Sequence, residues 1–342
     1  MASLSLLENL QLNDKKDKKD NNSDNTFQTL LFWVREHSKG KQKACWEGIQ
    51  LDRVTLKNGD GVMVAKTNIA KGSKLTLPPP CVLTQDKVLS STVGTLFSGL
   101  DIYTMFSLFI LWQKNIQHSF WKPYIDILPK DISFHPITFL DEHYKLRTQE
   151  ENKQLINEVD HYELLKRALI AQKKKLEGEW QRVQQLIKLH ERQGTLLDPT
   201  SQTTSKLIGA LTYDDFRWAN CMVISRAFNI AEPRMMCMLP LVDSMNHSGT
   251  NSNVKWRPKL VRGHFIMSMI SPIAIDVELT ACYHEKPNQN VKDAKAAMMA
   301  NLRCYLMYGF LEEGFDDTTP FASVRRFICK QEFHDMPELV KQ

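Results

Sequence analysis

Met238 to Trp256 reads MLPLVDSMNHSGTNSNVKW, an apolar run that breaks into polar residues before a second apolar segment. The run from Met236 to Val242 is typical of a buried strand, and polar side chains follow it at Asp243, Asn246 and His247. Side chains at the end of a buried strand can be held by the core while they face a ligand. The same residues also suit a turn whose polar groups are satisfied locally, so both interpretations stay open.

The composition is that of a globular protein. The chain has 342 residues, of which 42% are hydrophobic and 24% are charged. This length supports a substantial core and predicts either one domain with an insertion or two domains. Lysine and arginine number 44 against 39 aspartates and glutamates, a formal net charge of +5 at pH 7. So small a surplus could favour an acidic partner, but it does not indicate nucleic-acid binding.

The sequence shows no recognisable targeting or membrane segment. The start, MASLSLLENLQLNDKKDKKD, has no cationic region ahead of a long apolar core. No later run approaches the roughly 18 apolar residues that a membrane helix needs. We therefore expect a protein of the cytosol or nucleus without a membrane partner. Asn246-His247-Ser248 matches a glycosylation sequon, which would then not be used.

The cysteines lie far apart, without a C-x-x-C pair or a cluster of histidine and cysteine at metal-binding spacing. They are Cys45, Cys81, Cys221, Cys237, Cys282, Cys304 and Cys329. An odd number of cysteines at such spacing predicts reduced thiols and no zinc site.

The beginning of the chain changes from polar to amphipathic near Phe27. Leu12 to Asn25 offers almost nothing to bury and predicts a mobile tail, although its lysines could also act as a weak nuclear address. From Phe27 to Val34 the apolar residues recur at helical spacing, and Ser38-Lys39-Gly40 provides a stop. We expect one helix here that packs on the core.

Short strands with glycine turns should follow this helix. The expected strands lie at 54–56, 62–65 and 75–77. Gly59 and Gly61 stand between the first two, too close together for a dinucleotide-binding fingerprint and without a helix after them. Their expected use is to let the backbone approach another group closely.

The middle of the chain should be mostly helical. A strongly apolar helix is predicted from Ile102 to Ile116, and Trp121 to Pro129, WKPYIDILP, is predicted as an extended segment bounded by proline. From Asp141 to Gln193 the composition shifts to Glu, Lys, Gln and Leu, with apolar residues in one helical stripe. We expect one or two long amphipathic helices there.

The last third should alternate between helix and strand. Thr212 and Asp215 have the spacing of a capping box and predict the start of a helix. Alternating apolar residues predict a strand at 264–269, and Glu278 to Tyr283 predicts another. A short helix closed by a glycine is predicted from Asn301 to Phe310.

Four separated segments occur in an order that is characteristic of one family. They are SRAF at Ser225 to Phe228, LVDSMNHS at Leu241 to Ser248, ELTACY at Glu278 to Tyr283 and NLRCYLMYGF at Asn301 to Phe310. Together they resemble the SET-domain protein methyltransferases of the Rubisco large-subunit methyltransferase-like branch. GVMVAKTNIAKGSKLTLPPP, from Gly61 to Pro80, is similar to that family's first SET segment. The resemblance extends from Phe27 to Phe315.

The resemblance implies an α+β fold, in which a β-rich SET domain of short strands is interrupted by an inserted, mostly helical region. The implied parts are a disordered polar tail at 1–25, the first SET part at 26–98, the helical insertion at 99–211, the second SET part at 212–315 and a short C-terminal tail at 316–342. Family members commonly carry a helical substrate-binding domain after the SET domain. Only 32 residues follow Phe310, so a reduced C-terminal region is expected.

The resemblance also implies a site for S-adenosylmethionine. Its cofactor-binding residues would be Gly59, Gly61, Arg226, Phe228, Asp243, Asn246, His247 and Phe310, and Tyr283 would be the catalytic tyrosine. An arginine can pair with the cofactor's carboxylate, and asparagine and histidine can satisfy a buried adenine edge. Phenylalanine rings can line an apolar wall beside the positively charged sulfonium. No metal ion is required.

The implied reaction is methylation of a lysine side chain in a protein substrate. Only about one lysine amine in a thousand is neutral at pH 7, and a dry channel lowers its pKa. Alignment of the amine with the sulfonium would then supply most of the rate gain. Two alternatives stay open: histidine methylation on the same scaffold, and a catalytically inactive SET-fold module that holds a partner protein with its long helices.

Two features depart from the family pattern near the implied site. Asp276-Val277-Glu278-Leu279 stands where the family has Gly-Glu-Glu-Leu, so the turn lacks its glycine. Asn301 follows Tyr283 by 18 positions, several times the family's usual gap, which predicts an inserted loop at 284–300 beside the pocket. We expect this loop to be a mobile flap over the acceptor channel.

Overall fold

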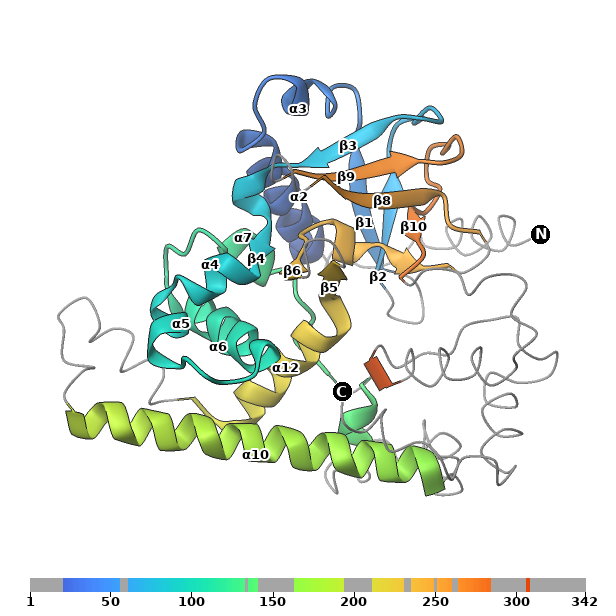
Figure 1. Ribbon diagram of the computed structural model, residues 1–342. Helices are drawn as coiled ribbons and strands as arrows, with labels where there is room; N and C mark the ends of the chain where they lie inside the picture. The colour runs from blue at the N-terminus through green and yellow to red at the C-terminus, as the bar shows by residue number, and fades with distance from the viewer. Residues whose placement is uncertain are drawn as a thin grey trace. The chain divides into compact units, whose positions relative to one another are not determined.

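A computed structural model of the chain describes residues 21–55, 61–132, 135–140, 163–193, 211–230, 235–248, 251–259, 264–283 and 306–307 (Figure 1). Their contacts divide them into two compact units. The strand-rich unit contains the described residues within Met1–Lys87, Ile116–Leu128 and Arg226–Glu285, and the helical unit contains those within Val88–Asn115, Pro129–Ser225 and Lys286–Gln342. Each unit is therefore assembled from segments that lie far apart in the sequence.

The strands of the described residues lie in the strand-rich unit and form three sheets (Figure 1). An antiparallel pair consists of β1 (Leu51–Thr55) and β2 (Gly61–Ala65). The largest sheet has the order β3-β9-β8-β10-β7, with β3 at Lys74–Leu77, β9 at His264–Met269, β8 at Val254–Lys259, β10 at Thr280–Ala281 and β7 at Asn246–His247. The third has the order β4-β6-β5, with β4 at Leu83–Thr84, β6 at Met235–Met238 and β5 at Ala227–Ile230. The fold is α+β, which confirms the predicted fold class.

The largest sheet joins an early strand of the chain to a late one. β3 pairs antiparallel with β9, which places Leu75 opposite Met267 and Leu77 opposite Phe265. All four side chains are buried, because alternate residues of a strand point to the same face. A slip of one residue would turn these side chains towards solvent, so their burial specifies the register.

An amphipathic helix, α2 (Asn21–Glu36), belongs to the strand-rich unit. Its residues Phe27, Leu30 and Val34 are buried, which confirms the helix predicted from their spacing. The helix begins at Asn21, although the polar composition predicts a tail up to residue 25. Once the buried face has nucleated a helix, polar residues can extend it, because each added residue gains a backbone hydrogen bond.

A short helix, α7 (Lys122–Ile125), stands where an extended segment is predicted at 121–129. That prediction is wrong for these residues because Pro123 lies in the first helical turn, where no backbone N–H is needed and the fixed φ of proline fits. The turn buries Tyr124 and Ile125. Further short helices of this unit are α3 (Lys41–Ala44), η1 (Pro79–Cys81) and η3 (Val242–Ser244).

Longer helices make up most of the helical unit that the structure describes (Figure 1). The long helices are α6 (Ile102–Asn115), α10 (Glu163–Gln193) and α12 (Tyr213–Arg226), and the short ones include α5 (Thr92–Leu96) and η2 (Pro136–Leu140). α4 (Gln85–Leu89) continues from the strand-rich unit into the helical one, and Arg226, the last residue of α12, belongs to the strand-rich unit. α10 buries Leu176 and Trp180, and the Trp180 ring stacks on Phe216 of α12 with centroids 5.4 Å apart. This confirms a long amphipathic helix from residue 163, and residues 141–162 lie outside the described parts.

The start of α12 has the predicted capping box. The N–H of Asp215 donates to Oγ1 of Thr212 at 3.1 Å, and the N–H of Thr212 donates to Oδ2 of Asp215 at 3.1 Å. Each side chain therefore satisfies a backbone donor of the first turn that would otherwise have no partner.

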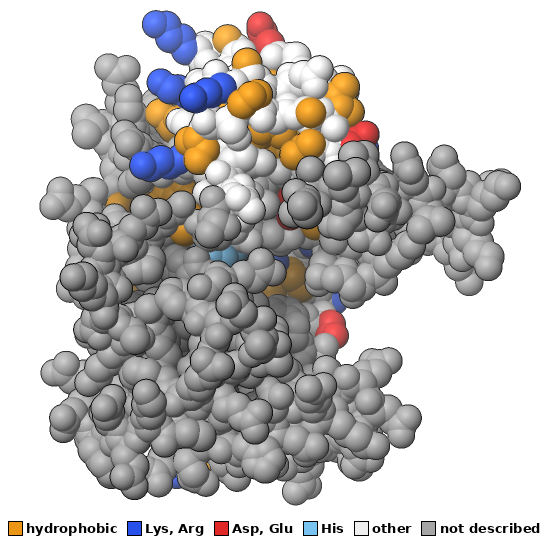
Figure 2. All heavy atoms as spheres, turned by 90° about the vertical axis from the view of Figure 1, so that its right-hand side faces the viewer, with side chains coloured by type: hydrophobic (Ala, Val, Ile, Leu, Met, Phe, Trp, Pro, Cys, Tyr) orange, Lys and Arg blue, Asp and Glu red, His pale blue; other side chains and the backbone are white. Residues whose placement is uncertain are grey.

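The described residues were compared with two kinds of site, a membrane-spanning helix and a cluster of metal ligands. None of the helices among them is apolar over a length that could cross a bilayer. Within the described ranges, no three histidine, cysteine, aspartate or glutamate side chains gather as metal ligands could. Figure 2 shows hydrophobic side chains interspersed with basic ones on one face, and the exposed hydrophobic residues of the described parts include Ile270, Ile275 and Val277. Scattered apolar side chains of this kind are normal on a protein surface.

Candidate functional site

Two polar motifs meet in the strand-rich unit because β7 pairs in parallel with β10. Asn246 lies opposite Thr280, and His247 lies opposite Ala281. Tyr283 follows β10 by two residues, so the pairing delivers it beside the Asn246–His247 segment.

Tyr283 is held against this segment by its backbone, its hydroxyl and its ring. Its N–H donates to Nδ1 of His247 at 3.1 Å, and its hydroxyl donates to the carbonyl oxygen of Met245 at 2.6 Å. The Tyr283 and His247 rings lie 5.2 Å apart between centroids. Because Nδ1 of His247 accepts a hydrogen bond, a neutral His247 ring carries its proton on Nε2. The Tyr283 oxygen retains lone pairs that can accept a further hydrogen bond.

The strand predicted from Glu278 to Tyr283 is shorter in the structure, where β10 covers only Thr280–Ala281. The residues before it pair with β2 instead. Glu278 forms a bridge to Val64, and the N–H of Leu279 donates to the carbonyl oxygen of Met63 at 2.8 Å. One segment thus links two sheets, and a local pattern of apolar residues carries no signal for such a link.

The apolar run before Asp243 also differs from the single strand predicted for 236–242. β6 ends at Met238, and the short helix η3 follows a residue with φ of 72°, Leu241. Pro240 lacks the backbone N–H that a longer ladder would use, so the strand stops before it. Asp243 is therefore presented by a buried helical turn instead of a strand end.

Asp243 lies in a buried polar cluster with Arg226, the last residue of α12. Nη1 of Arg226 donates to the backbone carbonyl oxygen of Asp243 at 2.8 Å and lies 3.9 Å from its carboxylate Oδ2. The hydroxyl of Tyr124 donates to the same Oδ2 at 2.5 Å. Tyr124 comes from α7, and the sequence reasoning misses it because it takes the surrounding segment as extended core.

The electrostatics of this cluster are set mainly by burial. Burial raises the pKa of Asp243 to about 6, although the charges of Arg226 and Arg53 and the Tyr124 hydrogen bond act in the opposite direction. Oδ1 of Asp243 and Nε of Arg226 are buried and have no hydrogen-bond partner among the described residues. The cluster therefore has one acceptor and one donor available for a bound molecule.

Asn246 connects β7 to two other segments. Its Nδ2 donates to Oε1 of Glu278 at 2.8 Å and to the carbonyl oxygen of Gly61 at 3.3 Å. The amide donors are thus used within the protein, and Oδ1 is the side-chain group that could accept a hydrogen bond from a ligand. Glu278 is a site residue that the sequence reasoning misses, and its place in the ELTACY motif is the available signal.

Phe228 belongs to an aromatic cluster that reaches the residue before Tyr283. Its ring centroid lies 5.1 Å from that of Trp256, edge to face, and 6.2 Å from that of Phe265. Nε1 of Trp256 donates to the carbonyl oxygen of Cys282 at 3.2 Å. Phe228 and Trp256 are half-buried, so they can line an apolar wall. Trp256 lies in the opening motif but was not among the residues predicted for the site.

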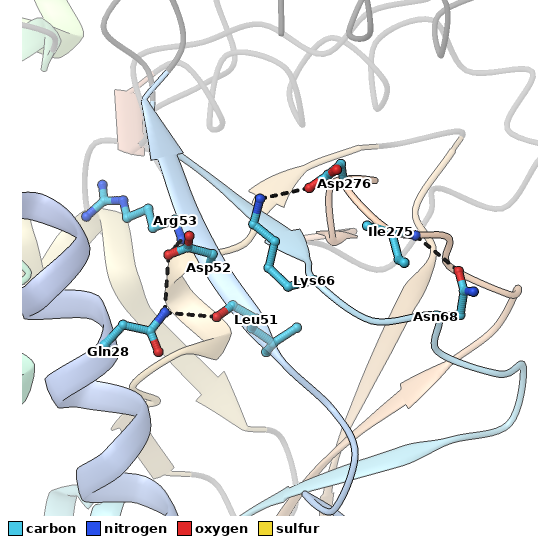
Figure 3. A network of polar contacts seen from close by, with 8 residues as sticks. All are labelled: Gln28, Leu51, Asp52, Arg53, Lys66, Asn68, Ile275 and Asp276. Atoms are coloured by element: carbon cyan, nitrogen blue, oxygen red, sulfur yellow. Dashed lines mark hydrogen bonds and ion pairs between the residues drawn. The ribbon is translucent and has the colours of Figure 1, made fainter. Parts of the chain in front are cut away.

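Asp276 adopts the left-handed conformation that the family's turn glycine would provide. Its φ is 61°, its N–H donates to the carbonyl oxygen of Ala65 at 2.7 Å, and its carboxylate accepts from Nζ of Lys66 at 2.8 Å (Figure 3). Aspartate enters this region more readily than most residues, because its short polar side chain can bond locally. The substitution for glycine therefore preserves the turn that leads to Glu278 and β10.

The predicted site residues that the structure describes all lie in the strand-rich unit. Direct contacts join Gly61 with Asn246, His247 with Tyr283 and Arg226 with Asp243, while Phe228 approaches the site through Trp256. Gly59, Phe310 and the loop at 284–300 lie outside the described residues.

No protein-family model matches the chain, but curated relatives do. The ribulose-1,5 bisphosphate carboxylase/oxygenase large subunit N-methyltransferase of Nicotiana tabacum is 29% identical over 212 residues, 60% of this chain and 38% of the relative. The [fructose-bisphosphate aldolase]-lysine N-methyltransferase of Arabidopsis thaliana is 28% identical over 187 residues, 54% of this chain and 33% of the relative. The actin-histidine N-methyltransferase of Gallus gallus is 25% identical over 235 residues, 66% of this chain and 35% of the relative. The chain thus spans between 33% and 38% of the length of these relatives.

Solved structures share the fold. The SET domain of LSMT bound to lysine and AdoHcy matches with a TM-score of 0.58 at 20% identity, over 84% of this chain and 57% of that one. The structure of Rubisco LSMT bound to AdoMet matches with the same TM-score, identity and coverage. Together with the relatives, these likenesses confirm the family resemblance predicted from the four sequence segments.

Proposed function

We propose that this chain, a SET-domain protein of the Rubisco large-subunit methyltransferase-like branch, is an S-adenosylmethionine-dependent protein-lysine N-methyltransferase. The observation that carries the proposal is the bonding of Tyr283 to Met245 and His247, which places the hydroxyl of the candidate catalytic residue beside the candidate cofactor residues. The name of the Arabidopsis thaliana relative specifies lysine as the acceptor, which supports this reaction class.

The described residues fit S-adenosylmethionine. The buried cluster offers Oδ1 of Asp243 as an acceptor and Nε of Arg226 as a donor, neither of which has a hydrogen-bond partner among the described residues. Arg226 would pair with the cofactor's carboxylate, while Oδ1 of Asn246 and the His247 ring would meet the adenine edge. The half-buried Phe228 ring would offer an aromatic face to the sulfonium. When bound, S-adenosylmethionine supplies a methyl group on a positively charged sulfur.

The chain's own residues would orient the acceptor. The Tyr283 hydroxyl donates a hydrogen bond to the Met245 carbonyl, so its oxygen can accept a hydrogen bond from an N–H of the substrate amine and hold the nitrogen lone pair in line for attack. The amine must be neutral to attack, and exclusion of water favours the neutral form. Tyr283 would therefore contribute position and electrostatic complementarity rather than proton transfer.

Histidine is the second candidate acceptor, because the actin-histidine N-methyltransferase match covers 66% of this chain. A catalytically inactive binding module is less well supported, because Asp276, which stands where the family has a turn glycine, adopts the left-handed conformation that such a glycine would provide. We propose a lysine-containing protein as the partner. The location of this chain in the cytosol or nucleus stays a prediction from the sequence, and the names of the two plant relatives describe those proteins as chloroplastic.

The proposal is tested by incubating the purified protein with methyl-labelled S-adenosylmethionine and lysate proteins, followed by mass spectrometry of the labelled peptides. We expect the label on a lysine Nζ. Label on histidine ring nitrogen would replace the lysine assignment with the second candidate. A protein that binds S-adenosylmethionine by calorimetry but labels nothing would favour the binding module.

A further inference from the structure

A second arginine lies beside the candidate cofactor residues. Arg53 stands on β1, opposite Met63 of β2, and its side chain extends from the strand away from Lys66 and Asp276 (Figure 3). Its guanidinium covers Gly61: a Cβ added to Gly61 would lie 2.5 Å from Nε and 2.6 Å from Nη2 of Arg53. The carbonyl oxygen of the same Gly61 accepts from Asn246. Gly61 therefore lies between Arg53 and Asn246, which belongs to the predicted adenine-binding segment.

Gly61 serves this arrangement through its missing side chain. Its φ lies outside the left-handed region, so an L-residue could adopt its backbone conformation. An alanine at this position would leave no room for the Arg53 guanidinium, because its Cβ would lie 2.5 Å to 2.6 Å from guanidinium nitrogens, far closer than the van der Waals distance. The glycine therefore makes space for Arg53.

The Arg53 guanidinium has donors to spare. Its one hydrogen bond among the described residues is long, from Nη1 to the carbonyl oxygen of Ile127 at 3.4 Å. It makes no ion pair with a carboxylate of the described residues, in contrast to Arg226, which reaches Asp243. A guanidinium has five N–H donors in a fixed plane, so several of them remain open to a ligand.

The charges around Arg53 favour an anion. Burial lowers the pKa of Arg53, the neighbouring charge of Arg226 lowers it further, and Asp243 raises it. The group nevertheless stays a cation, because arginine does not lose its proton in proteins. Asp243 is the acidic group whose charge acts on Arg53, of the two arginines it contacts only Arg226 directly, and partly buried cations without counter-ions are unfavourable. A carboxylate bound between them would restore the balance.

We propose that Arg53 is a second cofactor-positioning residue, which binds the carboxylate of S-adenosylmethionine together with Arg226. This inference rests on the proposed function and extends it to a residue outside the four motif segments. Two planar forks can hold the two oxygens of one carboxylate in a single orientation, which a lone arginine on a helix end does less well. Arg53 would thereby fix the amino-acid end of the cofactor, while Asn246 and His247 fix the adenosine end.

The test uses two ligands that share the adenosine and the sulfur but differ in the carboxylate. Calorimetry measures the affinity of the parent, Arg53→Gln and Arg53→Lys for S-adenosylhomocysteine and for 5′-methylthioadenosine, which has no amino-acid group. We expect Arg53→Gln to weaken S-adenosylhomocysteine about tenfold or more and to leave 5′-methylthioadenosine unchanged. Arg53→Lys should fall between, since lysine retains the charge but not the fork.

Equal losses for both ligands, or no loss for either, would overturn the role of Arg53 while leaving the proposed function standing. A parent that binds neither ligand would contradict the proposed function as well. Thermal unfolding of each variant shows whether a general loss of affinity comes from loss of the fold.

Gly61→Ala provides an independent variant. The atoms that its methyl group would meet are the end of a flexible side chain, so the fold can accommodate the change by displacing the guanidinium. We expect it to weaken S-adenosylhomocysteine as Arg53→Gln does, and to add nothing in the Arg53→Gln background. Additive losses in the double variant would mean that Gly61 acts without Arg53 and would contradict the coupling.

Discussion

The hydroxyl of Tyr283 donates a hydrogen bond to the carbonyl oxygen of Met245, 2.6 Å away. This bond fixes the phenol oxygen beside β7 before any ligand binds. It also means that the hydroxyl has a structural role besides its proposed catalytic one, and the two contributions have to be measured separately.

Tyr283→Phe should reduce the free energy of unfolding by about 1 kcal/mol. The change removes the hydrogen bond to Met245 but retains the ring that packs on His247. Chemical denaturation of the parent and the variant measures this difference. Tyr103→Phe, in the helical unit, is a control for removal of a phenol oxygen elsewhere. A loss above about 3 kcal/mol would mean that the hydroxyl is mainly a structural group.

Asn246→Ala should weaken cofactor binding about tenfold and also destabilise the fold. The variant leaves the Glu278 carboxylate without its 2.8 Å donor and loses the link to Gly61. Calorimetry with S-adenosylhomocysteine and denaturation give the two effects. Glu278→Gln is the matched variant on the other side of this hydrogen bond, because glutamine retains an acceptor oxygen and the shape of the side chain but removes the negative charge. Unchanged cofactor affinity in Asn246→Ala would remove this residue from the site.

Asp243 should make the free energy of unfolding depend on pH, with a larger contribution to stability in mild acid than at neutral pH. Burial raises its pKa on folding to about 6, so the folded state binds the proton more tightly than the unfolded state. The resulting stabilisation is fully present below the ordinary pKa of about 4 and is lost as the pH rises through about 6. For a shift of about two units it amounts to about 3 kcal/mol.

The measurement compares the free energy of unfolding of the parent and Asp243→Asn between pH 4 and pH 8. Asparagine has nearly the same shape and cannot titrate, so the difference between the two proteins isolates this carboxyl group. We expect the parent to lose stability relative to the variant as the pH rises. A difference that does not change with pH would show that Asp243 is ionised throughout the range.

The left-handed conformation of Asp276 should be visible in a pair of substitutions. Asp276→Gly and Asp276→Ala both remove the ion pair to Lys66, which is exposed and contributes at most about 1 kcal/mol. Only alanine has a Cβ that opposes the φ of 61°, so it should be less stable than glycine by about 1 kcal/mol. Lys66→Ala measures the ion pair alone. Equal stability of the two Asp276 variants would contradict the left-handed turn.

The helices and the alternation of β9 could be predicted because their signals are local. α6 and α10 follow from apolar periodicity and lie within the predicted ranges, and the start of α12 follows from the capping box. Local patterns gave wrong predictions at two prolines, one of which starts a helix and one of which ends a strand. Pro123 fits the first turn of a helix, whereas Pro240 ends a strand that the apolar run alone would continue.

The candidate site residues were predicted from the family motifs, and their roles stay predictions. Arg226, Asp243, Asn246 and His247 stand in those motifs, and so does Glu278, the partner of Asn246. Tyr124, the partner of Asp243, comes from a segment far away in the sequence and outside the motifs. Such pairings depend on how sheets and turns meet in three dimensions. A single sequence carries no signal for them until the register of β2, β7 and β10 is known.

The most direct test of the proposed function is the single-turnover rate of methyl transfer by the parent and by Tyr283→Phe on the same acceptor lysine, with saturating S-adenosylmethionine. Because the change leaves the ring in place, we predict a rate about 10²-fold lower at nearly unchanged cofactor affinity, the usual effect of losing one preorganised oxygen at a reacting centre. Equal rates for the two proteins would contradict the catalytic role of Tyr283 and the mechanism built on it.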